Sequence, residues 1–199
     1  MTPQELNETV QRYRDIVRDP ATSQEAFLAA LAAVQAARVL YESTPTAVYP
    51  LGSFAVLSGQ MIAVDAFGSA EHAVSIPSVL NGAWHAWVGV AAGVHVALFA
   101  CHDTAVPAPF PTLPELMQAA WVEVGSVPID TATCALADRE AYLPLAVEEV
   151  EYQIAGLRTH LCFSNTANAD GGYPVFVRAE NGQVVAVYVE FMPLAEVEQ

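Results

Sequence analysis

The residues best suited to do chemistry lie in a polar, glycine-containing loop near the end of the chain, Ser164 to Gly172. Asn165, Asn168 and Asp170 offer side-chain oxygens there, and the glycine pair after Asp170 lets the backbone turn sharply. Tyr173 follows with a ring that can wall a pocket and a hydroxyl that can bond a ligand. The loop therefore predicts a candidate binding site that includes Asn168, Asp170 and Tyr173.

A second segment with reactive side chains contains Asp130, Thr133 and Asp138. Two carboxylates that converge can act as acid and base. Thr133 or Cys134 could supply a nucleophile, but no histidine lies close to them in the sequence. Arg139 is the only positively charged neighbour that could favour a thiolate. If a site exists, we expect it where this segment meets the Ser164–Tyr173 loop.

The acidic residues of both segments also have structural explanations. Asp138 precedes Arg-Glu-Ala-Tyr and is typical of a helix N-cap. Asp130 and Asp170 are typical of turns in which the side chain bonds its own backbone. We favour these structural roles over catalysis.

No cofactor or metal is predicted. The loop has oxygen-bearing residues at alternate positions up to Asp170, but Val177 stands where a calcium loop needs its closing Glu. His85 and His95 are too far apart along an extended chain to share one ion, since a hairpin would separate them by ~13 Å.

The composition excludes several classes of protein. The chain has 199 residues, a formal charge of -15, and no lysine, so Schiff-base and Walker-type lysine chemistry are excluded. The acidic charge argues against nucleic-acid and anionic-membrane partners and leaves a protein partner as the expectation. Three widely spaced cysteines and a polar N-terminal segment predict a reduced, cytoplasmic protein.

Two hairpins are expected to form much of the fold. Asn181-Gly182 predicts a two-residue type I′ turn between apolar strands. A two-residue loop with an uninterrupted ladder predicts the cross-strand pairs Glu180–Gln183, Arg178–Val185, Phe176–Val187 and Tyr173–Glu190. The uncharged run 84–101 is long enough to span a membrane, but its histidines and glycines favour two buried strands joined at residues 91–93.

Helices are predicted at four places. Thr2-Pro3-Gln4-Glu5 and Thr22-Ser23-Gln24-Glu25 are typical capping boxes, and the helices that they begin form a hairpin over residues 1–45. A shorter helix is expected from Thr112 to Val122, and a fourth from Val147 to Leu157.

The segment from Asp170 to Phe191 resembles the C-terminal signature of DUF4241, a bacterial domain family without an assigned activity. The resemblance rests on Asp-Gly-Gly-Tyr-Pro-Val-Phe, the Asn-Gly turn and a strand that ends in Glu-Phe. The segments 125–141 and 59–88 are similar to the family's central segment and entry strands. The resemblance covers about residues 51–191 and implies a shared fold.

Together these features predict an α+β protein, with a helical hairpin at 1–45 and a mostly antiparallel, two-layer β domain with short helices at 51–199. The function expected first is a non-catalytic binding or protein-interaction module. The alternatives are a small hydrolase that uses the loop carboxylates, and a structural homodimer joined through the N-terminal helices.

Overall fold

The protein is described by a computed structural model that covers residues 1–43, 46–146, 153–166 and 170–193. The helices are α1 Pro3–Arg18, α2 Gln24–Glu42 and α3 Leu113–Met117. The strands are β1 Ala47–Val56, β2 Gln60–Asp65, β3 Val74–Pro77, β4 Gly82–Ala91, β5 Val94–His102, β6 Val122–Ile129, β7 Thr133–Asp138, β8 Ala155–Arg158, β9 Leu161–Asn165, β10 Gly171–Glu180 and β11 Gln183–Glu190. Two single-turn 3-10 helices occupy Ala70–His72 and Asp103–Ala105.

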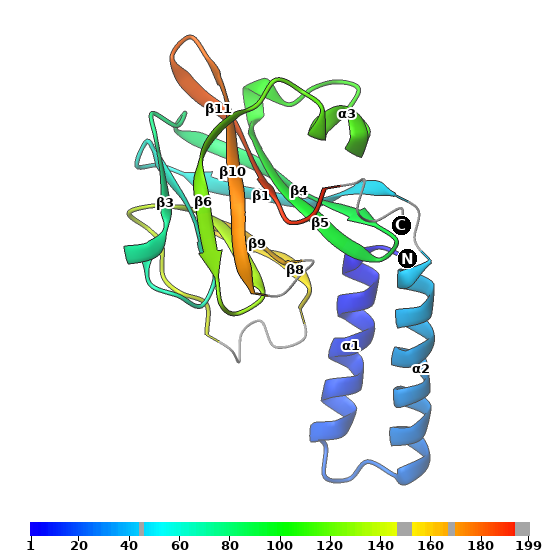
Figure 1. Ribbon diagram of the computed structural model, residues 1–199. Coiled ribbons are helices and arrows are strands. Elements are labelled where there is room, and N and C mark those ends of the chain that lie inside the picture. Colours follow the sequence, from blue (N-terminus) through cyan, green and yellow to red (C-terminus); the bar gives the residue numbers. More distant parts are fainter. Residues whose placement is uncertain (44–45, 147–152, 167–169, 194–199) are drawn as a thin grey trace.

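The strands form two antiparallel sheets that pack face to face (Figure 1). The larger sheet has the order β1-β4-β5-β11-β10-β6, and the smaller has the order β3-β2-β7-β9-β8. The helix pair α1–α2 precedes these strands in the sequence. The predicted α+β class and its two-layer antiparallel β architecture are therefore confirmed.

The main core lies between the two sheets. Trp84, Leu98 and Val175 from the larger sheet share one buried cluster with Met61 and Leu136 from the smaller sheet. All five are fully buried, as expected where alternate residues of both sheets face the same interior. This rigid core holds the strand ends and loops in which polar side chains could form a site.

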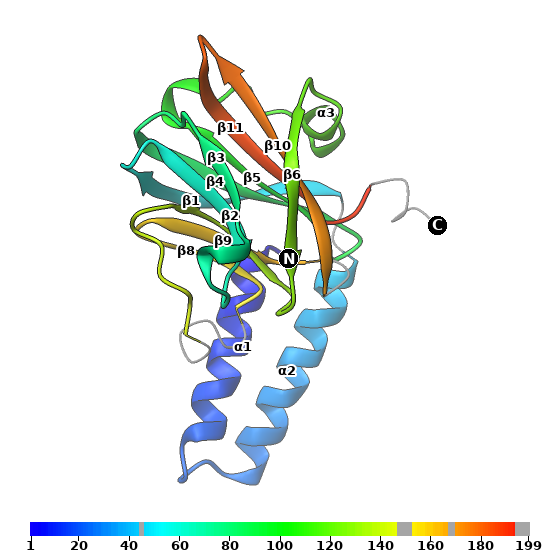
Figure 2. The same cartoon turned by 60° about the vertical axis from the view of Figure 1, so that its left-hand side comes forward.

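The two long helices form an arm that projects from the β domain (Figures 1 and 2). The predicted capping box at Thr2 is present, and Pro3 occupies the first turn of α1. The cap of α2 differs from the prediction by one residue, because the hydroxyl of Ser23 accepts the Ala26 N–H. The base of the arm is held to the β domain: the Asn7 amide donates to the Ala155 carbonyl oxygen and accepts from Ile154 N–H.

Both predicted hairpins are confirmed, but each contains a β-bulge. In the β10–β11 hairpin Glu180 pairs with Gln183, and Asn181 and Gly182 adopt positive φ angles of 51° and 78°. The ladder then skips Val185, so the predicted pairs beyond the turn are wrong by one residue. The observed pairs are Arg178–Ala186, Phe176–Tyr188 and Val175–Val189.

Two predicted helices differ from the structure. The helix expected from Thr112 to Val122 ends at Met117, and at its start the Glu115 carboxylate accepts the Thr112 N–H. The helix expected over 147–157 is wrong at its described end, since Leu157 lies in β8. Leu157 packs against the main core, so tertiary burial outweighs the helical spacing of its apolar neighbours. Residues 147–152 lie outside the described part.

Candidate functional site

Asp130 and Asp170, the two carboxylates expected to meet, are placed at the same end of one strand pair. Gly171 pairs with Ile129 at the end of the β10–β6 ladder; Asp170 directly precedes Gly171, and Asp130 directly follows Ile129. The Asp65 carboxylate holds the turn at Asp130 in place, because it accepts the N–H groups of Asp130 and Thr131. This arrangement matches a structural role for the turn.

Asp138 lies away from this pair, at the opposite end of β7 from Thr133. The five residue-to-residue steps of β7 place them ~17 Å apart. The expected helix N-cap is wrong, because Asp138 ends a strand. Its carboxylate accepts four backbone N–H groups, those of Leu57, Ser58, Glu140 and Ala141. A carboxylate used in this way holds two loops together and has no role at the predicted site.

Tyr173 is buried in the main core, edge-on to Phe191 at 5.5 Å between ring centroids. Tyr173 pairs with Val127 of β6, and the Glu190 carboxylate, its predicted cross-strand partner, accepts from the Tyr188 hydroxyl. The Tyr173 ring and Asp170 nevertheless line a shallow pocket of about 290 Å³. Asn168 lies outside the described residues.

A larger cleft, of about 540 Å³, lies at the base of the helical arm. It separates α1 and α2 from the β4–β5 turn and from Asn165 and Thr166 at the end of β9. Its walls are mainly apolar: Leu6, Val10, Val34, Val94 and Ile154. Its polar lining consists of Tyr13, Tyr41, His95, Asn165 and Thr166, with Arg38 and Glu42 at the end of α2. Small-molecule sites commonly have this size and this mixture of apolar walls and few polar groups.

A buried chain of hydrogen bonds forms the floor of this cleft. The Tyr41 hydroxyl lies 2.5 Å from Nε2 of His95, and Nδ1 of His95 lies 2.7 Å from the Ser164 hydroxyl. Ser164 donates its proton to the Asn165 carbonyl oxygen, so it accepts from Nδ1–H. Nε2 is then the acceptor for Tyr41, and the histidine is neutral.

Burial fixes these protonation states. It lowers the pKa of His95 to about 4, because an imidazolium ion would lose its hydration in this position. Burial also raises the pKa of Tyr41 well above its usual value, so the phenol keeps its proton. The hydrogen-bonded side chains of Tyr41, His95 and Ser164 therefore stay uncharged at neutral pH.

A β-bulge turns His95 toward the cleft. The β4–β5 ladder skips Val96, so Ala97 pairs with Gly89 while His95 pairs with Val90. In an uninterrupted ladder joined at residues 91–93, His95 would instead pair with Gly89, and its imidazole would lie on the same face of the sheet as His85. Because Tyr41 and Ser164 are 54 and 69 residues away from His95 in the chain, no spacing in the sequence indicates this cluster.

This chain of bonds is unsuited to catalysis. Both ring nitrogens of His95 already have partners within the protein, and Ser164 is 0% exposed. A nucleophile that no substrate can reach cannot attack one. The arrangement instead ties the end of α2 to a strand of each sheet and gives the cleft a rigid, polar floor.

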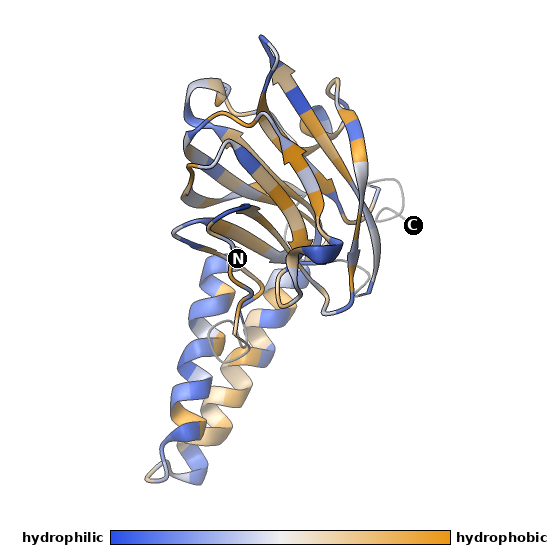
Figure 3. Ribbon diagram, turned by 90° about the vertical axis from the view of Figure 1, so that its left-hand side faces the viewer, coloured by the Kyte–Doolittle hydropathy of each residue, from blue (hydrophilic) through white to orange (hydrophobic). Residues whose placement is uncertain are grey.

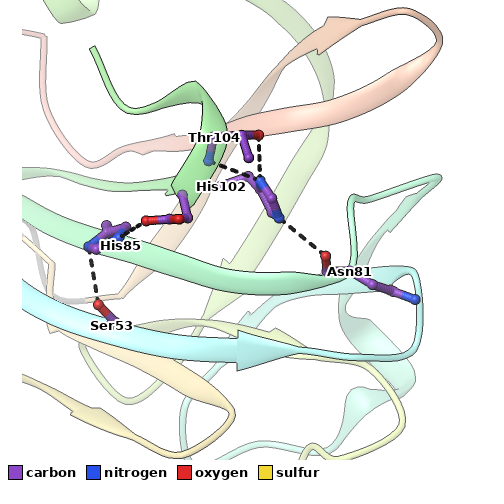
Figure 4. Close-up of polar contacts among 6 residues, drawn as sticks. Ser53, Asn81, His85, His102 and Thr104 are labelled. Carbon is purple, nitrogen blue, oxygen red and sulfur yellow. Dashed lines mark hydrogen bonds and ion pairs between the residues drawn. The ribbon is translucent and has the colours of Figure 1, made fainter. Parts of the chain in front are cut away.

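A second polar group lies on the outer surface of the larger sheet (Figure 4). Ser53 of β1 is paired directly opposite His85 of β4, and its hydroxyl lies 3.1 Å from Nδ1. Nε2 of His85 lies 2.8 Å from the carboxylate of Asp103, just after β5. The three side chains are connected in the order of a serine–histidine–aspartate relay. Here the serine contacts Nδ1 and the aspartate contacts Nε2, which is the reverse of the usual arrangement.

This surface group adjoins an aromatic pocket. The rings of His85 and Trp87 lie 6.0 Å apart, and Trp87 stacks on Phe110 at 4.3 Å. Trp87 and Phe110 line a pocket of about 200 Å³ together with Cys101, the cross-strand partner of His85. His102 has a separate role, since its ring bonds Thr104 and the Asn81 carbonyl oxygen (Figure 4).

Within the described ranges, no three histidine, cysteine or acidic side chains are grouped closely enough to hold a metal ion. None of the described helices has the length and apolar character needed to cross a membrane. No family model, curated protein or solved structure matches the chain. The resemblance to DUF4241 therefore stays a prediction.

Proposed function

We propose that the protein is a non-catalytic binding module that holds a small, mainly apolar molecule in the cleft at the base of the arm. The observation that carries this proposal is the combination of apolar walls with the Tyr41–His95–Ser164 chain as a rigid floor. Binding to such a preformed surface costs little ordering of the protein.

The polar lining of the cleft favours an uncharged ligand. His95 is neutral, and the charge of Arg38 is matched by Glu42 at 2.9 Å. The Tyr41 oxygen donates to His95 and keeps lone pairs that can accept a hydrogen bond from a ligand. The ligand class is therefore a neutral molecule with an apolar body and one hydrogen-bonding end.

Binding of the neutral fluorescent probe N-phenyl-1-naphthylamine tests this function. The wild-type protein should bind the probe saturably, with one site per chain and a blue-shifted emission. Val34→Trp should abolish this site, because the larger ring fills the cleft. Val17→Trp is the matched control, since Val17 is an exposed residue of α1 outside the cleft lining. Equal probe binding by both variants, or none by the wild type, would contradict the proposal.

A second candidate function is hydrolysis of small esters at Ser53, His85 and Asp103. Asp103 accepts from Nε2–H and thereby leaves Nδ1 free to take the proton of the Ser53 hydroxyl during attack on a carbonyl carbon. Ser53 is exposed, so a substrate can reach it, and the aromatic pocket can hold the acyl or leaving group. Water also reaches Asp103, whose side chain is 64% exposed, and competes with His85 for its carboxylate. Hydrolysis is for this reason the second candidate and not the first.

Turnover of p-nitrophenyl acetate tests this alternative. If the relay is catalytic, Ser53→Ala should lower kcat/KM by at least about 100-fold, in the range of general-base contributions. Ser126→Ala replaces another exposed strand serine and should leave the rate unchanged. Identical rates for the two variants would rule hydrolysis out.

We also propose a cytoplasmic location and a protein with reduced thiols. Cys101, Cys134 and Cys162 are all free and buried, and buried free cysteines are typical of a reducing compartment.

A further inference from the structure

The side of α2 that faces away from the β domain, here called the outer face of α2, is apolar and exposed. Leu28, Val39 and Leu40 are 53%, 64% and 57% exposed. Figure 3 shows the contrast between the two helices of the arm, with hydrophobic colours along α2 and hydrophilic colours along α1. The outer face consists of Ala26, Leu28, Ala29, Ala32, Ala33, Ala36, Val39 and Leu40, all of them exposed.

The helical geometry gathers these residues into one surface. At 100° per residue they lie within an arc of ~160°, centred opposite Phe27, whose ring contacts Tyr13 of α1. Glu25, in the first turn of α2, is the one charged residue within this arc. No charged residue interrupts α2 between Glu25 and Arg38. A helix of an isolated domain normally covers such an arc with polar residues, so this face has the composition of an interface.

The charge of the protein excludes a lipid surface as the occupant of the outer face. Helices that lie on membranes carry lysine and arginine beside their apolar face. This chain has no lysine and a formal charge of -15, so an anionic bilayer repels it.

A second copy of the chain is the occupant that fits the outer face. Beyond Glu25 in the first turn, the outer face carries no charge, so two copies can meet there despite their net charge. Its five alanines allow two helix axes to approach closely. The exposed surface of the eight side chains is on the order of 500 Å² per copy, so a pair buries ~1,000 Å², about the minimum for a specific interface.

We propose that the protein forms a symmetric homodimer in which the outer faces of two α2 helices pack antiparallel. A two-fold axis makes the same face serve both copies. The antiparallel order places the two acidic β domains at opposite ends of helices that are ~28 Å long, which reduces their repulsion. This inference is independent of the ligand proposed for the cleft, which lies on the other side of α2.

Light scattering during gel filtration tests the dimer. The wild-type chain should elute with twice the monomer mass at tens of micromolar protein. Val39→Glu should give a monomer, because two carboxylates would be buried in the interface. Gln11→Glu, an equally acidic change on the exposed side of α1, should remain a dimer. A monomeric wild type, or a dimer that tolerates both Val39→Glu and Ala32→Glu, overturns the proposal.

Disulfide trapping tests the antiparallel order in the otherwise native chain. The three native cysteines are buried, so a new surface thiol should react without background. Ala32→Cys lies near the midpoint of α2 and should form a covalent dimer on oxidation, whereas Val39→Cys near the end should not. Cross-linking of Val39→Cys as efficiently as Ala32→Cys would show a parallel pair, in which each residue meets its own copy, and would overturn the proposed arrangement.

Discussion

His95 is the residue whose burial has the clearest consequence for pH dependence. Its pKa of about 4 in the folded protein lies below the ordinary value near 6.5, so its contribution to stability is fully present above pH 6.5. The contribution is lost as the pH falls from ~6.5 toward 4, because the unfolded chain binds the proton first. The loss is on the order of 3 kcal/mol over this range.

His95→Gln removes this titration and keeps a polar side chain of similar reach. We expect the free energy of unfolding of the variant to be lower at pH 7 and to depend less on pH between 6.5 and 4 than that of the wild type. Urea unfolding across this range measures both quantities. A parallel decline of wild type and variant would show that His95 does not titrate there.

Asp138 should matter for stability and not for binding. Burial would raise the pKa of this carboxyl, but the N–H groups of Ser58, Leu57 and Ala141 outweigh that effect, and the pKa is lowered. Its stabilisation is present above the ordinary pKa, near 4, and is lost as the pH falls through the lower folded value.

Asp138→Asn should therefore cost about 2 kcal/mol at pH 7, since hydrogen bonds to a charged acceptor are lost. Thermal unfolding should show this difference shrinking below about pH 4. Probe binding in the cleft should be unaffected, and a variant that unfolds normally but no longer binds the probe would contradict this assignment.

Among the secondary-structure elements, the β4–β5 turn determines how the arm is attached. Gly93 has a φ of 75°, and a Cβ atom built on it would lie 2.5 Å from the Glu42 Cα at the end of α2. The turn and the helix are therefore in backbone contact, which only glycine allows.

A pair of glycine substitutions distinguishes the free-energy cost of disturbing this backbone contact from the cost of a left-handed φ alone. Gly182 has a similar φ of 78°, but a Cβ atom there meets nothing within 4 Å. Gly182→Ala should cost about 1 kcal/mol of unfolding free energy through its left-handed φ alone. Gly93→Ala should cost at least about 1 kcal/mol more, since α2 must move. Equal losses in denaturant unfolding would show that the arm does not depend on the contact.

The elements also show what sequence patterns can and cannot predict. The turn at Asn181-Gly182 and the capping box at Thr2 were predicted correctly because a few adjacent residues determine them. The bulges at Val96 and Val185 were missed, and each shifts a register by one residue. The cleft was missed for a related reason, since Tyr41, His95 and Ser164 meet only after α2, β5 and β9 are packed together.

At the scale of the whole molecule, the three cysteines report on the integrity of the core. Cys134 and Cys162 lie between the sheets, and burial raises the pKa of Cys162 to about 12 and that of Cys101 to about 11. A buried thiol with a raised pKa provides little thiolate at neutral pH. In the native protein we expect Ellman's reagent to react with none of the three within minutes, and with all three in denaturant. Rapid reaction of one thiol in the native state would reveal local opening of its sheet.

The order of strands in the larger sheet has a consequence for synthesis on the ribosome. β10 and β11 follow every other described strand in the chain, yet they lie between β5 and β6. Until both have left the exit tunnel, β5 has no neighbour on one side and β6 has no partner in this sheet, so their backbone groups are unpaired there. A growing chain therefore carries two exposed apolar strand edges, which are prone to pair with other chains. Premature termination before β10 would leave a product for chaperones or proteases, and the slowest step in forming the sheet would be the insertion of its central hairpin.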